Sequence, residues 1–514
     1  MTGGSDHFDV IIVGAGLSGI GMAHHLQRLA PAETSAILEE RGAIGGTWDL
    51  FRYPGIRSDS DMHTLGYNFR PWTDPDAIAG GDKIRRYIEE TAREAGIDRH
   101  IRFGTRVKRA AWSSEDARWR VEAEDGSALT CRFLIMCAGY YSYDEGHRPR
   151  WEGEDSFAGR IVHPQFWPDD LDWRGKRVAV IGSGATAVTL IPALAKEAAH
   201  VTMVQRSPSY VAARPSQDPI GRRLKRVLPK GTAVGLTRWK NVLLQLFFFR
   251  LARRKPEKAK ATLIDLVRKE VGEAQIHHFT PSYNPWDQRL CLAPDGDIFA
   301  CIRDGSASVA TGAIERFTPN GLRLVSGEEV TADIIVTATG LKVTLAGETT
   351  VEVDGQPVRL AEAMAYKGVM FSDVPNFASI FGYTNASWTL KADLSAAWLC
   401  RLLNRMRRSG AAIAVPRRDP DVEERPFLDF TSGYVQRALP HLPKQGDRGP
   451  WRLPQNYLLD ILTLRFGRMA DGVLALSPLP LAGGAEPRGE RGGPIPNPDT
   501  PSPTPSRKRE GSFS

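Results

Sequence analysis

Two glycine-rich segments, far apart in the chain, each stand between a short apolar run and a stretch with helical character. The first reads Gly14-Ala-Gly16-Leu-Ser18-Gly19 and follows an apolar run over residues 9–13. A G-x-G-x-x-G sequence between a buried strand and a helix is typical of a turn that binds a dinucleotide. Gly14 permits the tight turn, Gly16 lets a pyrophosphate approach the backbone, and Gly19 lets the helix pack on the strand. We therefore predict a parallel strand, a pyrophosphate-binding turn and a helix here.

The second segment has the same organisation. An apolar run over residues 177–181 precedes it, and a helix is expected to continue to about Lys196. Alanine takes the place of the third glycine, which such turns allow. The residues expected to contact a nucleotide are Gly182, Ser183, Gly184, Ala185, Thr186, Ala187 and Val188.

The residue at the end of the next strand distinguishes the two nucleotides. After the first turn this residue is Glu39, which can accept hydrogen bonds from the hydroxyls of an unphosphorylated ribose, as in FAD or NAD. After the second turn it is Arg206, followed by Ser207. A guanidinium presents a planar fork to a phosphate, and a hydroxyl adds a donor. We therefore predict that the second site binds NADP through its 2′-phosphate.

A linker just ahead of the second turn carries a further pattern. It contains Phe157-x-Gly159-x-x-x-His163-x-x-x-Trp167-Pro168, and its glycine and prolines predict irregular structure. The pattern closely resembles the fingerprint of the type I Baeyer–Villiger monooxygenases. In the related flavin monooxygenases that oxidise nitrogen and sulfur, the Trp position usually holds another aromatic residue. This linker lies between two nucleotide sites, where relative motion of two cofactors must be controlled.

Two other stretches resemble the same family. Residues 46–59 resemble the loop that covers the flavin, and residues 283–291 contain Arg289. On the residues alone, Arg289 fits a catalytic cation and a strand-edge ion pair equally well, and the resemblance favours the catalytic role. The resemblance also implies that the backbone near Val107 lies against the adenine of FAD. The loop over residues 382–393 precedes an expected helix to about Met406 and would suit the carbonyl edge of the flavin.

The resemblance implies a reaction. NADPH would reduce FAD, and one oxygen atom of O₂ would be inserted next to a ketone carbonyl to give an ester or lactone. Sulfides or thioamides would also be oxidised. Arg289 would stabilise negative charge, Asp59 would orient Arg289, and both would be catalytic, whereas His163 and Trp167 would couple the domains. The residues expected to bind cofactors, beyond those of the second turn, are Gly14, Gly16, Ser18, Gly19, Glu39, Gly46, Thr47, Trp48, Asp49, Leu50, Arg57, Ser58, Asp59, Val107, Arg206 and Ser207.

Three alternatives remain open. A heteroatom flavin monooxygenase would share both nucleotide turns. A disulfide reductase is disfavoured, because the five cysteines include no C-x-x-C pair. A non-catalytic NADPH-sensing protein would bind both nucleotides and transfer no oxygen.

The length of 514 residues predicts two or three domains. We predict an α/β fold with two Rossmann-like dinucleotide-binding domains, for FAD and NADP, and a helical insertion. The expected boundaries are 1–145 and 339–476 for the FAD-binding domain, 146–214 and 282–338 for the NADP-binding domain, 215–281 for the insertion, and 477–514 for a disordered tail. Periodicity also predicts a helix near 83–96 and strands over 102–107 and 119–124.

The insertion combines basic runs with the apolar patch Leu243-Leu-Gln-Leu-Phe247-Phe-Phe-Arg250. Packing in the core or along a substrate tunnel is the preferred interpretation, and a helix on a membrane surface is the alternative. The net charge of +7 is small for this length, so we expect a small-molecule partner and no nucleic acid. Scattered cysteines indicate no zinc site, and no metal is expected. With no signal peptide or membrane span visible, we expect a cytoplasmic protein.

Overall fold

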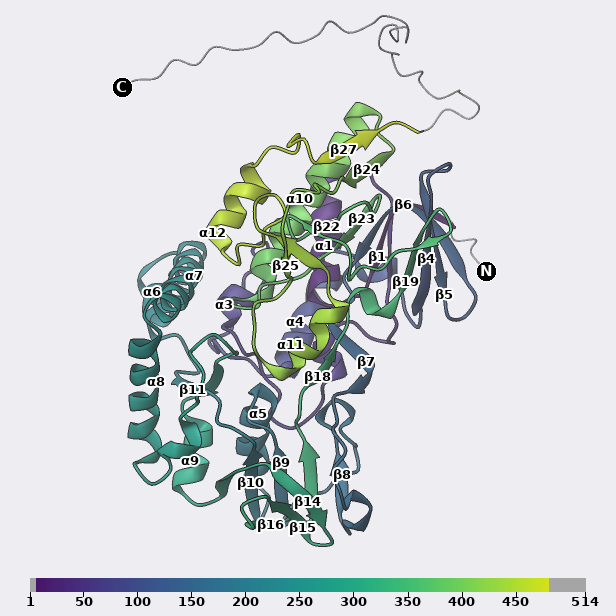
Figure 1. The fold of residues 1–514 in the computed structure, drawn as a ribbon. Coiled ribbons are helices and arrows are strands. Elements are labelled where there is room, and N and C mark those ends of the chain that lie inside the picture. The colour runs from purple at the N-terminus through teal and green to yellow at the C-terminus, as the bar shows by residue number, and fades with distance from the viewer. Residues whose placement is uncertain (1–5, 480–514) are drawn as a thin grey trace, which may run out of the picture. The chain divides into compact units, whose positions relative to one another are not determined.

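The first glycine-rich turn joins a buried strand to a helix in the computed structural model, which describes residues 6–479 (Figure 1). Strand β1 (His7–Val13) pairs in parallel with β2 (Ser35–Leu38) and β6 (Ala128–Met136), and α1 (Leu17–Leu29) connects β1 to β2. Residues 10–13 of β1 are all buried. Residues 10–13 are continuously apolar and do not alternate with polar residues, as expected for a strand that is covered on both faces.

Within the described residues, eleven strands form this first sheet, and its main path runs β20-β19-β4-β5-β6-β1-β2-β3. Its other strands are β3 (Ile101–Arg102), β4 (Val107–Ser113), β5 (Arg118–Ala123), β19 (Thr350–Val353), β20 (Gln356–Pro357), β21 (Ala365–Tyr366), β22 (Met370–Phe371) and β23 (Phe377–Ser379). The strand predicted over 102–107 is wrong. The chain turns at Gly104, whose φ of 65° favours glycine, so β3 and β4 are separate strands.

The second glycine-rich turn lies in a five-stranded parallel sheet with the order β13-β10-β9-β17-β8. The strands are β8 (Arg160–Val162), β9 (Arg177–Ile181), β10 (His200–Gln205), β13 (Ala307–Thr311) and β17 (Ile334–Thr337). Helix α5 (Ala185–Leu194) connects β9 to β10, so both predicted turns stand at the carboxyl end of a buried parallel strand. The chain is therefore an α/β protein with two Rossmann-like units, as predicted.

The linker predicted to be irregular contains strand β8, and this part of the prediction is wrong. Ile161 and Val162 pair with Ile335 and Val336 of β17 at the edge of the sheet. Pairing with a neighbouring strand stabilises an extended conformation that local propensity does not reveal. A Cβ atom at Gly159 would lie 2.2 Å from the carbonyl oxygen of Asp333, so the glycine allows β8 to start against β17.

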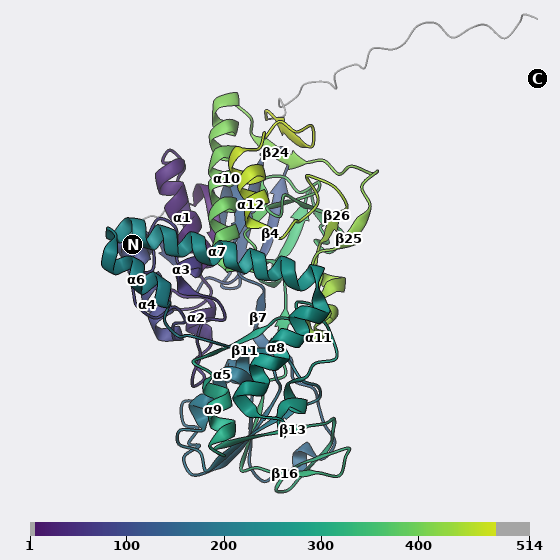
Figure 2. The same cartoon turned by 90° about the vertical axis from the view of Figure 1, so that its left-hand side faces the viewer.

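Three consecutive helices make up the predicted insertion: α6 (Pro219–Val227), α7 (Lys230–Arg254) and α8 (Pro256–Val271). Figure 2 shows α7 running in front of the first unit, with α8 leading down to the second. None of the helices within residues 6–479 has the length and apolar character needed to cross a bilayer.

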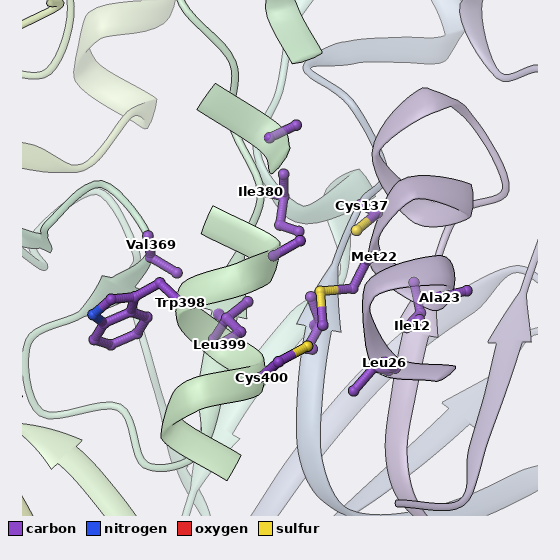
Figure 3. Close-up of a cluster of buried hydrophobic side chains, with 14 of the residues drawn as sticks. Ile12, Met22, Ala23, Leu26, Cys137, Val369, Ile380, Trp398, Leu399 and Cys400 are labelled. Carbon is purple, nitrogen blue, oxygen red and sulfur yellow. The ribbon is translucent and has the colours of Figure 1, made fainter. Parts of the chain in front are cut away.

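Two short strands carry the chain between the units. Strand β7 (Tyr141–Gly146) leaves the first sheet, β18 (Leu341–Val343) returns to it, and the two pair antiparallel. Helix α10 (Trp388–Ser409) then packs along α1. Figure 3 shows Met22 and Leu26 of α1 facing the side of α10 that carries Leu399 and Cys400, all of them buried.

The last described strand, β27 (Leu474–Ser477), pairs with β24 (Ile413–Pro416). Ser477, where the tail was predicted to begin, is thus the last residue of a strand, and residues 480–514 of the predicted tail lie outside the described residues.

The remaining helices and strands are α2 (Thr47–Leu50), α3 (Met62–Leu65), α4 (Gly81–Glu94), α9 (Asp297–Arg303), α11 (Gly433–Ala438), α12 (Tyr457–Asp460), β11 (Val211–Arg214), β12 (Cys291–Pro294), β14 (Ile314–Thr318), β15 (Gly321–Leu324), β16 (Glu329–Thr331), β25 (Glu424–Pro426) and β26 (Lys444–Gly446). Short 3₁₀ turns cover Asp98–His100, Glu154–Ser156, Pro164–Phe166, Ile276–Phe279, Ala346–Glu348 and Leu439–His441, and a π-helical turn covers Ile461–Phe466.

Candidate functional site

One cavity of about 1150 Å³ is lined by both glycine-rich turns, the insertion and the segments around β7 and β18. Pockets for a single drug-sized ligand usually measure about 300–1000 Å³. The volume of this cavity exceeds that range, and its lining includes both glycine-rich turns, so one continuous cavity reaches both predicted nucleotide sites.

The first turn is built by close backbone contacts. Gly14 has a φ of 105°, and a Cβ atom there would lie 2.6 Å from the carbonyl oxygen of Cys137. A Cβ atom at Gly19 would lie 1.8 Å from the carbonyl oxygen of Gly14. Gly46, with a φ of 57°, packs against Gly16 from the next loop. The backbone on the cavity side is thus left bare, which is what the approach of a pyrophosphate to a helix N-terminus needs.

Glu39 lies beside this turn, immediately after β2. Its carboxylate accepts hydrogen bonds from the backbone N–H of Ala15, at 2.6 Å, and of Arg41, at 2.9 Å. The side chain is buried yet lines the cavity, and burial raises its pKa. The two N–H donors fix the carboxylate in place, and two oxygens have capacity left for ribose hydroxyls.

The loop over residues 45–59, which follows β2, packs against the second unit. Gly55 lies against α5, where a Cβ atom would be 2.4 Å from the carbonyl oxygen of Thr189. Arg57 forms an ion pair with Asp297 at the start of α9. The buried Asp49 is held by Arg41, at 2.6 Å, and Arg52, at 2.9 Å. The structure thus indicates that Asp49 has a structural role in this loop.

The second turn repeats the geometry of the first. Gly182 has a φ of 134°, and a Cβ atom there would lie 2.3 Å from the carbonyl oxygen of Ala338. Gly184 is the N-cap of α5, and a Cβ atom on it would meet no atom within 4 Å. Open space therefore adjoins the N-terminus of α5, where N–H donors favour an anion.

A cluster of basic side chains lies near the second turn. Arg206 and Ser207 follow β10 and line the cavity, as does Arg437 of α11. The pKa of Arg437 is lowered by burial and by repulsion from Arg206, and burial together with Arg437 lowers the pKa of His147. Within residues 6–479 neither Arg206 nor Arg437 forms an ion pair. Cations that repel one another without a carboxylate between them favour a bound anion.

Arg289 lies in the cavity ahead of β12. Its guanidinium donates a hydrogen bond of 2.8 Å to Asp59, and Tyr140 lies beside it. Tyr140, Tyr434 and Asp59 favour the charged form and hold the pKa of Arg289 above its ordinary value. The Nε atom of Arg289 is buried and has no hydrogen-bond partner among the described residues. Arg289 is therefore a fixed cation with a spare donor.

The fingerprint residues lie outside the cavity, against the crossing strands. The ring of His163 packs so closely on Gly146 of β7 that a Cβ atom there would lie 2.0 Å from Cε1. The side-chain amide of Gln165 donates to the carbonyl oxygens of Ser142, at 2.8 Å, and Tyr143, at 3.3 Å. Trp167 packs on Trp173, and both are partly buried against the core of the second unit. Phe157 is buried against Phe317. The segment thus joins the second unit to the strand that leaves the first.

Most of the predicted cofactor residues line the cavity. They are Gly14, Gly16, Ser18, Glu39, Gly46, Thr47, Trp48, Arg57, Asp59, Val107, Gly182, Ser183, Gly184, Ala185, Thr186, Arg206 and Ser207. The others contribute no cavity wall, and they are Gly19, Asp49, Leu50, Ser58, Ala187 and Val188. These residues belong to the packing beneath the turns and loops.

Tyr140 and Arg437 line the cavity and were not predicted from the sequence. Tyr140 stacks on Trp388 with ring centroids 5.2 Å apart, and the indole N–H of Trp388 donates to Ser18 at 2.7 Å. Arg437 comes from a short helix more than 200 positions beyond Arg206. No sequence signal places Arg437 there, because the contact depends on how the chain returns to the first unit. The small-residue turn after β6 is the signal that could have indicated Tyr140.

The described structure resembles solved flavoproteins. Oxidized steroid monooxygenase bound to NADP aligns with a TM-score of 0.73 and 24% identity, over 92% of this chain and 100% of that chain. OTEMO in complex with FAD and NADP aligns with a TM-score of 0.67 and 23% identity, over 80% and 86%. At these identities the likeness shows a shared fold.

Sequence comparisons reach further. A family model described as pyridine nucleotide-disulphide oxidoreductase matches residues 11–230. The FAD-containing monooxygenase EthA of Mycobacterium tuberculosis (strain ATCC 25618 / H37Rv) is 53% identical over 483 residues, which cover 93% of this chain and 99% of the relative. The probable FAD-binding monooxygenase AlmA of Acinetobacter baylyi (strain ATCC 33305 / BD413 / ADP1) is 47% identical over 476 residues, covering 91% and 96%.

Proposed function

The chain belongs to the family of FAD-containing monooxygenases that includes EthA, and on that premise we propose that it is a Baeyer–Villiger enzyme. It is an NADPH-dependent flavin monooxygenase with FAD and NADPH as its cofactors. The proposed reaction inserts one oxygen atom of O₂ next to a ketone carbonyl to give an ester or lactone, and sulfides or thioamides are further substrates. One observation carries the proposal: a single cavity joins both nucleotide turns and holds the fixed cation Arg289.

FAD fits the first turn. The bare backbone of Gly14 and Gly16 accepts the pyrophosphate, Glu39 accepts from the ribose hydroxyls, and Val107 packs at the cavity wall. The N-terminus of α10 lines the cavity, and the buried Oδ1 atom of Asn385 has no partner among the described residues. This loop is available to the polar edge of the flavin. Reduced by NADPH, the bound flavin supplies the activated oxygen atom, and the residues around it bind, orient and exclude water.

NADPH fits the second turn. The N-terminus of α5 receives the pyrophosphate, and Arg206 and Ser207 receive the 2′-phosphate. Arg437 lines the same cavity and adds a second guanidinium from the first unit. A ligand held by Arg206 and Arg437 together would bridge both units of the protein.

Arg289 stabilises the negative charge that develops on substrate oxygen. A preorganised cation in a site that excludes water does this without reorganisation of solvent. Asp59 accepts a hydrogen bond from one side of the guanidinium and leaves the buried Nε donor to point elsewhere. Asp59 thereby orients Arg289 and also contributes to the nicotinamide side of the cavity.

His163 and Trp167 serve as positioning residues. Neither of them lines the cavity: His163 packs on Gly146 of β7, and Trp167 packs on Trp173 of the second unit. Their proposed role is to keep the two nucleotide units in register during turnover. The domain boundaries that we propose are those expected from the sequence, with the helical insertion 215–281 between the two parts of the NADP-binding domain.

Product analysis tests this function. The purified protein, NADPH and O₂ are incubated with a simple ketone and, separately, with a thioether, and the products are identified by mass. An ester one oxygen atom heavier than the ketone supports the proposal. Oxidation of the thioether alone would identify a heteroatom monooxygenase, and oxygen transfer to neither, with both nucleotides bound, would identify an NADPH-binding protein without oxygenase activity.

A further inference from the structure

Helix α7 has three faces with different surroundings. The first face is buried against the first unit. Arg238 donates to the carbonyl oxygens of His63 and Gly66, both at 2.8 Å, and Asn241 donates to Asp61 at 2.9 Å. Val242 and Leu246 complete this face. These contacts fix the rotation of the helix about its axis, so the other two faces have defined directions.

The second face of α7 lines the cavity. It carries Leu244, Gln245, Phe248, Leu251 and Ala252, which are spaced as one side of a helix. The predicted packing along a substrate tunnel therefore describes this face of the apolar patch, but not the whole patch.

The third face of α7 points away from the first unit and from the cavity. It carries Leu236, Trp239, Leu243 and Phe247, at intervals of three and four residues, and none of them lines the cavity. Leu243 is 51% exposed and Phe247 is 59% exposed. A stripe of four large apolar side chains in contact with water marks a surface that binds something.

The stripe continues onto neighbouring elements. Trp239 contacts Tyr457 of α12 at a centroid distance of 6.0 Å, which brings the C-terminal turns alongside α7. Seventeen large apolar side chains are exposed among the described residues. Nine of them lie on α6, on the third face of α7, on α12 and on the adjacent π-helical turn, so exposed apolar side chains are concentrated in this region. We call this set the apolar surface, and it consists of Ile220, Val227, Leu236, Trp239, Leu243, Phe247, Leu459, Leu462 and Phe466.

Positive charge accompanies the apolar surface. Residues 219–255 contain eleven Lys and Arg residues and no Asp or Glu. Lys240 and Arg253 are neutralised by ion pairs, and Arg238 is the buried anchor described above. The other eight form no ion pair within residues 6–479, and they are Arg222, Arg223, Lys225, Arg226, Lys230, Arg250, Arg254 and Lys255.

We propose that the apolar surface docks on an anionic lipid bilayer. A basic helix with exposed Trp, Phe and Leu lies in the plane of a membrane interface, where the apolar side chains enter the boundary between headgroups and acyl chains. Guanidinium and ammonium groups of this segment that form no ion pair within residues 6–479 meet the lipid phosphates. The binding is peripheral, in keeping with the absence of a membrane-spanning helix among the described residues. A second copy of the chain is a poorer occupant, because it would bring the same uncompensated cations face to face.

Docking through the apolar surface would affect how substrates reach the cavity. The outward face and the cavity face of α7 adjoin on one helix, so a docked molecule holds its cavity beside the bilayer. Resting on the proposed oxygenase function, this favours substrates that partition into lipid. The docking itself does not depend on the reaction and can be tested without turnover.

The test is sedimentation of the full-length protein with vesicles. Binding is expected to vesicles of phosphatidylglycerol and phosphatidylcholine, to weaken with added salt, and to be at least about ten-fold weaker with phosphatidylcholine alone. The double variant Leu243→Ser/Phe247→Ser should lower the partition coefficient at least about ten-fold, since both side chains lose apolar burial. Arg250→Gln/Arg254→Gln should lower binding to anionic vesicles by about 25-fold, or about five-fold for each charge.

Val325→Ser is the matched control. Val325 is 69% exposed in the turn between β15 and β16, far from the insertion in sequence, and its loss should leave vesicle binding unchanged. Flavin content and turnover of a small soluble substrate should persist in the serine double variant, because Leu243 and Phe247 line no part of the cavity. Failure of the unmodified protein to bind anionic vesicles at low salt, or equal binding by the double variants, would overturn the proposal. So would conversion of an oligomer to a monomer by Leu243→Ser/Phe247→Ser with vesicle binding unchanged, which would make the surface a self-interface.

Discussion

Arg289 donates a hydrogen bond of 2.8 Å to Asp59, although 230 positions separate them in the chain. Asp59 belongs to the loop over residues 45–59, which follows β2. Arg289 precedes β12, which pairs in parallel with β11 in a two-stranded sheet, and the helical insertion lies between these two strands in the sequence. The ion pair forms only when both nucleotide units and the connecting segments are in place. The position of the proposed catalytic cation therefore depends on the assembly of the whole site.

The flavin is the first expectation to check. Denaturation of the purified protein should release FAD and not FMN, because Glu39 serves a ribose that FMN lacks. Glu39→Ala should weaken FAD binding by about ten- to a hundred-fold, as expected for loss of hydrogen bonds to a charged group. Chromatography of the released flavin, with titration of FAD into the apoprotein, measures both. Release of FMN alone would contradict the assignment of the first turn.

Arg206 should determine the choice between NADPH and NADH. Arg206→Ala removes a charge-assisted contact of ~1.5–3 kcal/mol, which corresponds to about ten- to a hundred-fold in NADPH affinity. NADH, which has no 2′-phosphate, should be affected little. Steady-state kinetics with each nucleotide make the comparison. An equal loss with both would mean that Arg206 has a structural role.

Arg437→Ala should show the same selectivity. Arg437 lies on a different unit but lines the same cavity, and Arg206 already lowers its pKa. NADPH affinity should fall by about ten-fold while NADH use is retained. Arg425→Ala, which removes an exposed arginine outside the cavity, provides the control. If Arg437→Ala left NADPH affinity unchanged, Arg206 and Ser207 alone would bind the phosphate.

Gly146→Ala tests the role of the fingerprint histidine. The added Cβ atom would lie 2.0 Å from Cε1 of His163, so the ring must move. We expect His163→Ala and Gly146→Ala to lower the fraction of NADPH oxidation that yields oxygenated product, with FAD still bound. The double variant should be no worse than either single variant, because the two changes remove one contact. Product formed per NADPH consumed is the measurement, and additive losses would show that Gly146 acts independently of His163.

The two nucleotide turns could be predicted from the sequence because their determinants are local. Gly14 and Gly182 need positive φ values, and the strand and helix on either side have continuous apolar patterns. The positions of Glu39 and Arg206 could be predicted for the same reason, because each residue directly follows a strand. Strand β8 could not be predicted, because its extended conformation depends on pairing with β17, far along the chain.

Some residues that line the cavity also could not be predicted, because their positions depend on tertiary contacts. Leu243 and Leu244 are neighbours in one apolar patch, yet one faces outward and the other lines the cavity. The hydrogen bonds of Arg238 and Asn241 to the first unit decide which side of α7 faces outward. The sequence pattern of α7 does not reveal these hydrogen bonds. Arg437 likewise reaches the basic cluster only through the path of the chain after α10. The sequence therefore indicated most of the residues that we propose to bind nucleotides, and tertiary contacts decide which other residues line the same cavity.

Arg289→Ala is the sharpest test of the mechanism. The proposed role of the cation begins when negative charge develops on substrate oxygen, and its effect would be strengthened where bound cofactors and substrate displace water from the cavity. The variant should keep FAD and should still oxidise NADPH. Ester formation should fall by at least ~10², and hydrogen peroxide should be released in its place. Lys should rescue only in part, because it lacks the planar fork that lets Arg289 contact Asp59 and still present a second donor.

Asp59→Asn distinguishes the effect of Asp59 on the orientation of Arg289 from the effect of its negative charge. The amide retains an oxygen that can accept from the guanidinium but removes the carboxylate, so the loss of ester formation should be smaller than in Arg289→Ala. Product yield and hydrogen peroxide, measured per NADPH consumed, report on the oxygenating step and not on folding. Normal ester yield in Arg289→Ala would show that Arg289 is only a structural partner of Asp59. A cation that stabilises charge in a reaction step cannot be removed without slowing that step.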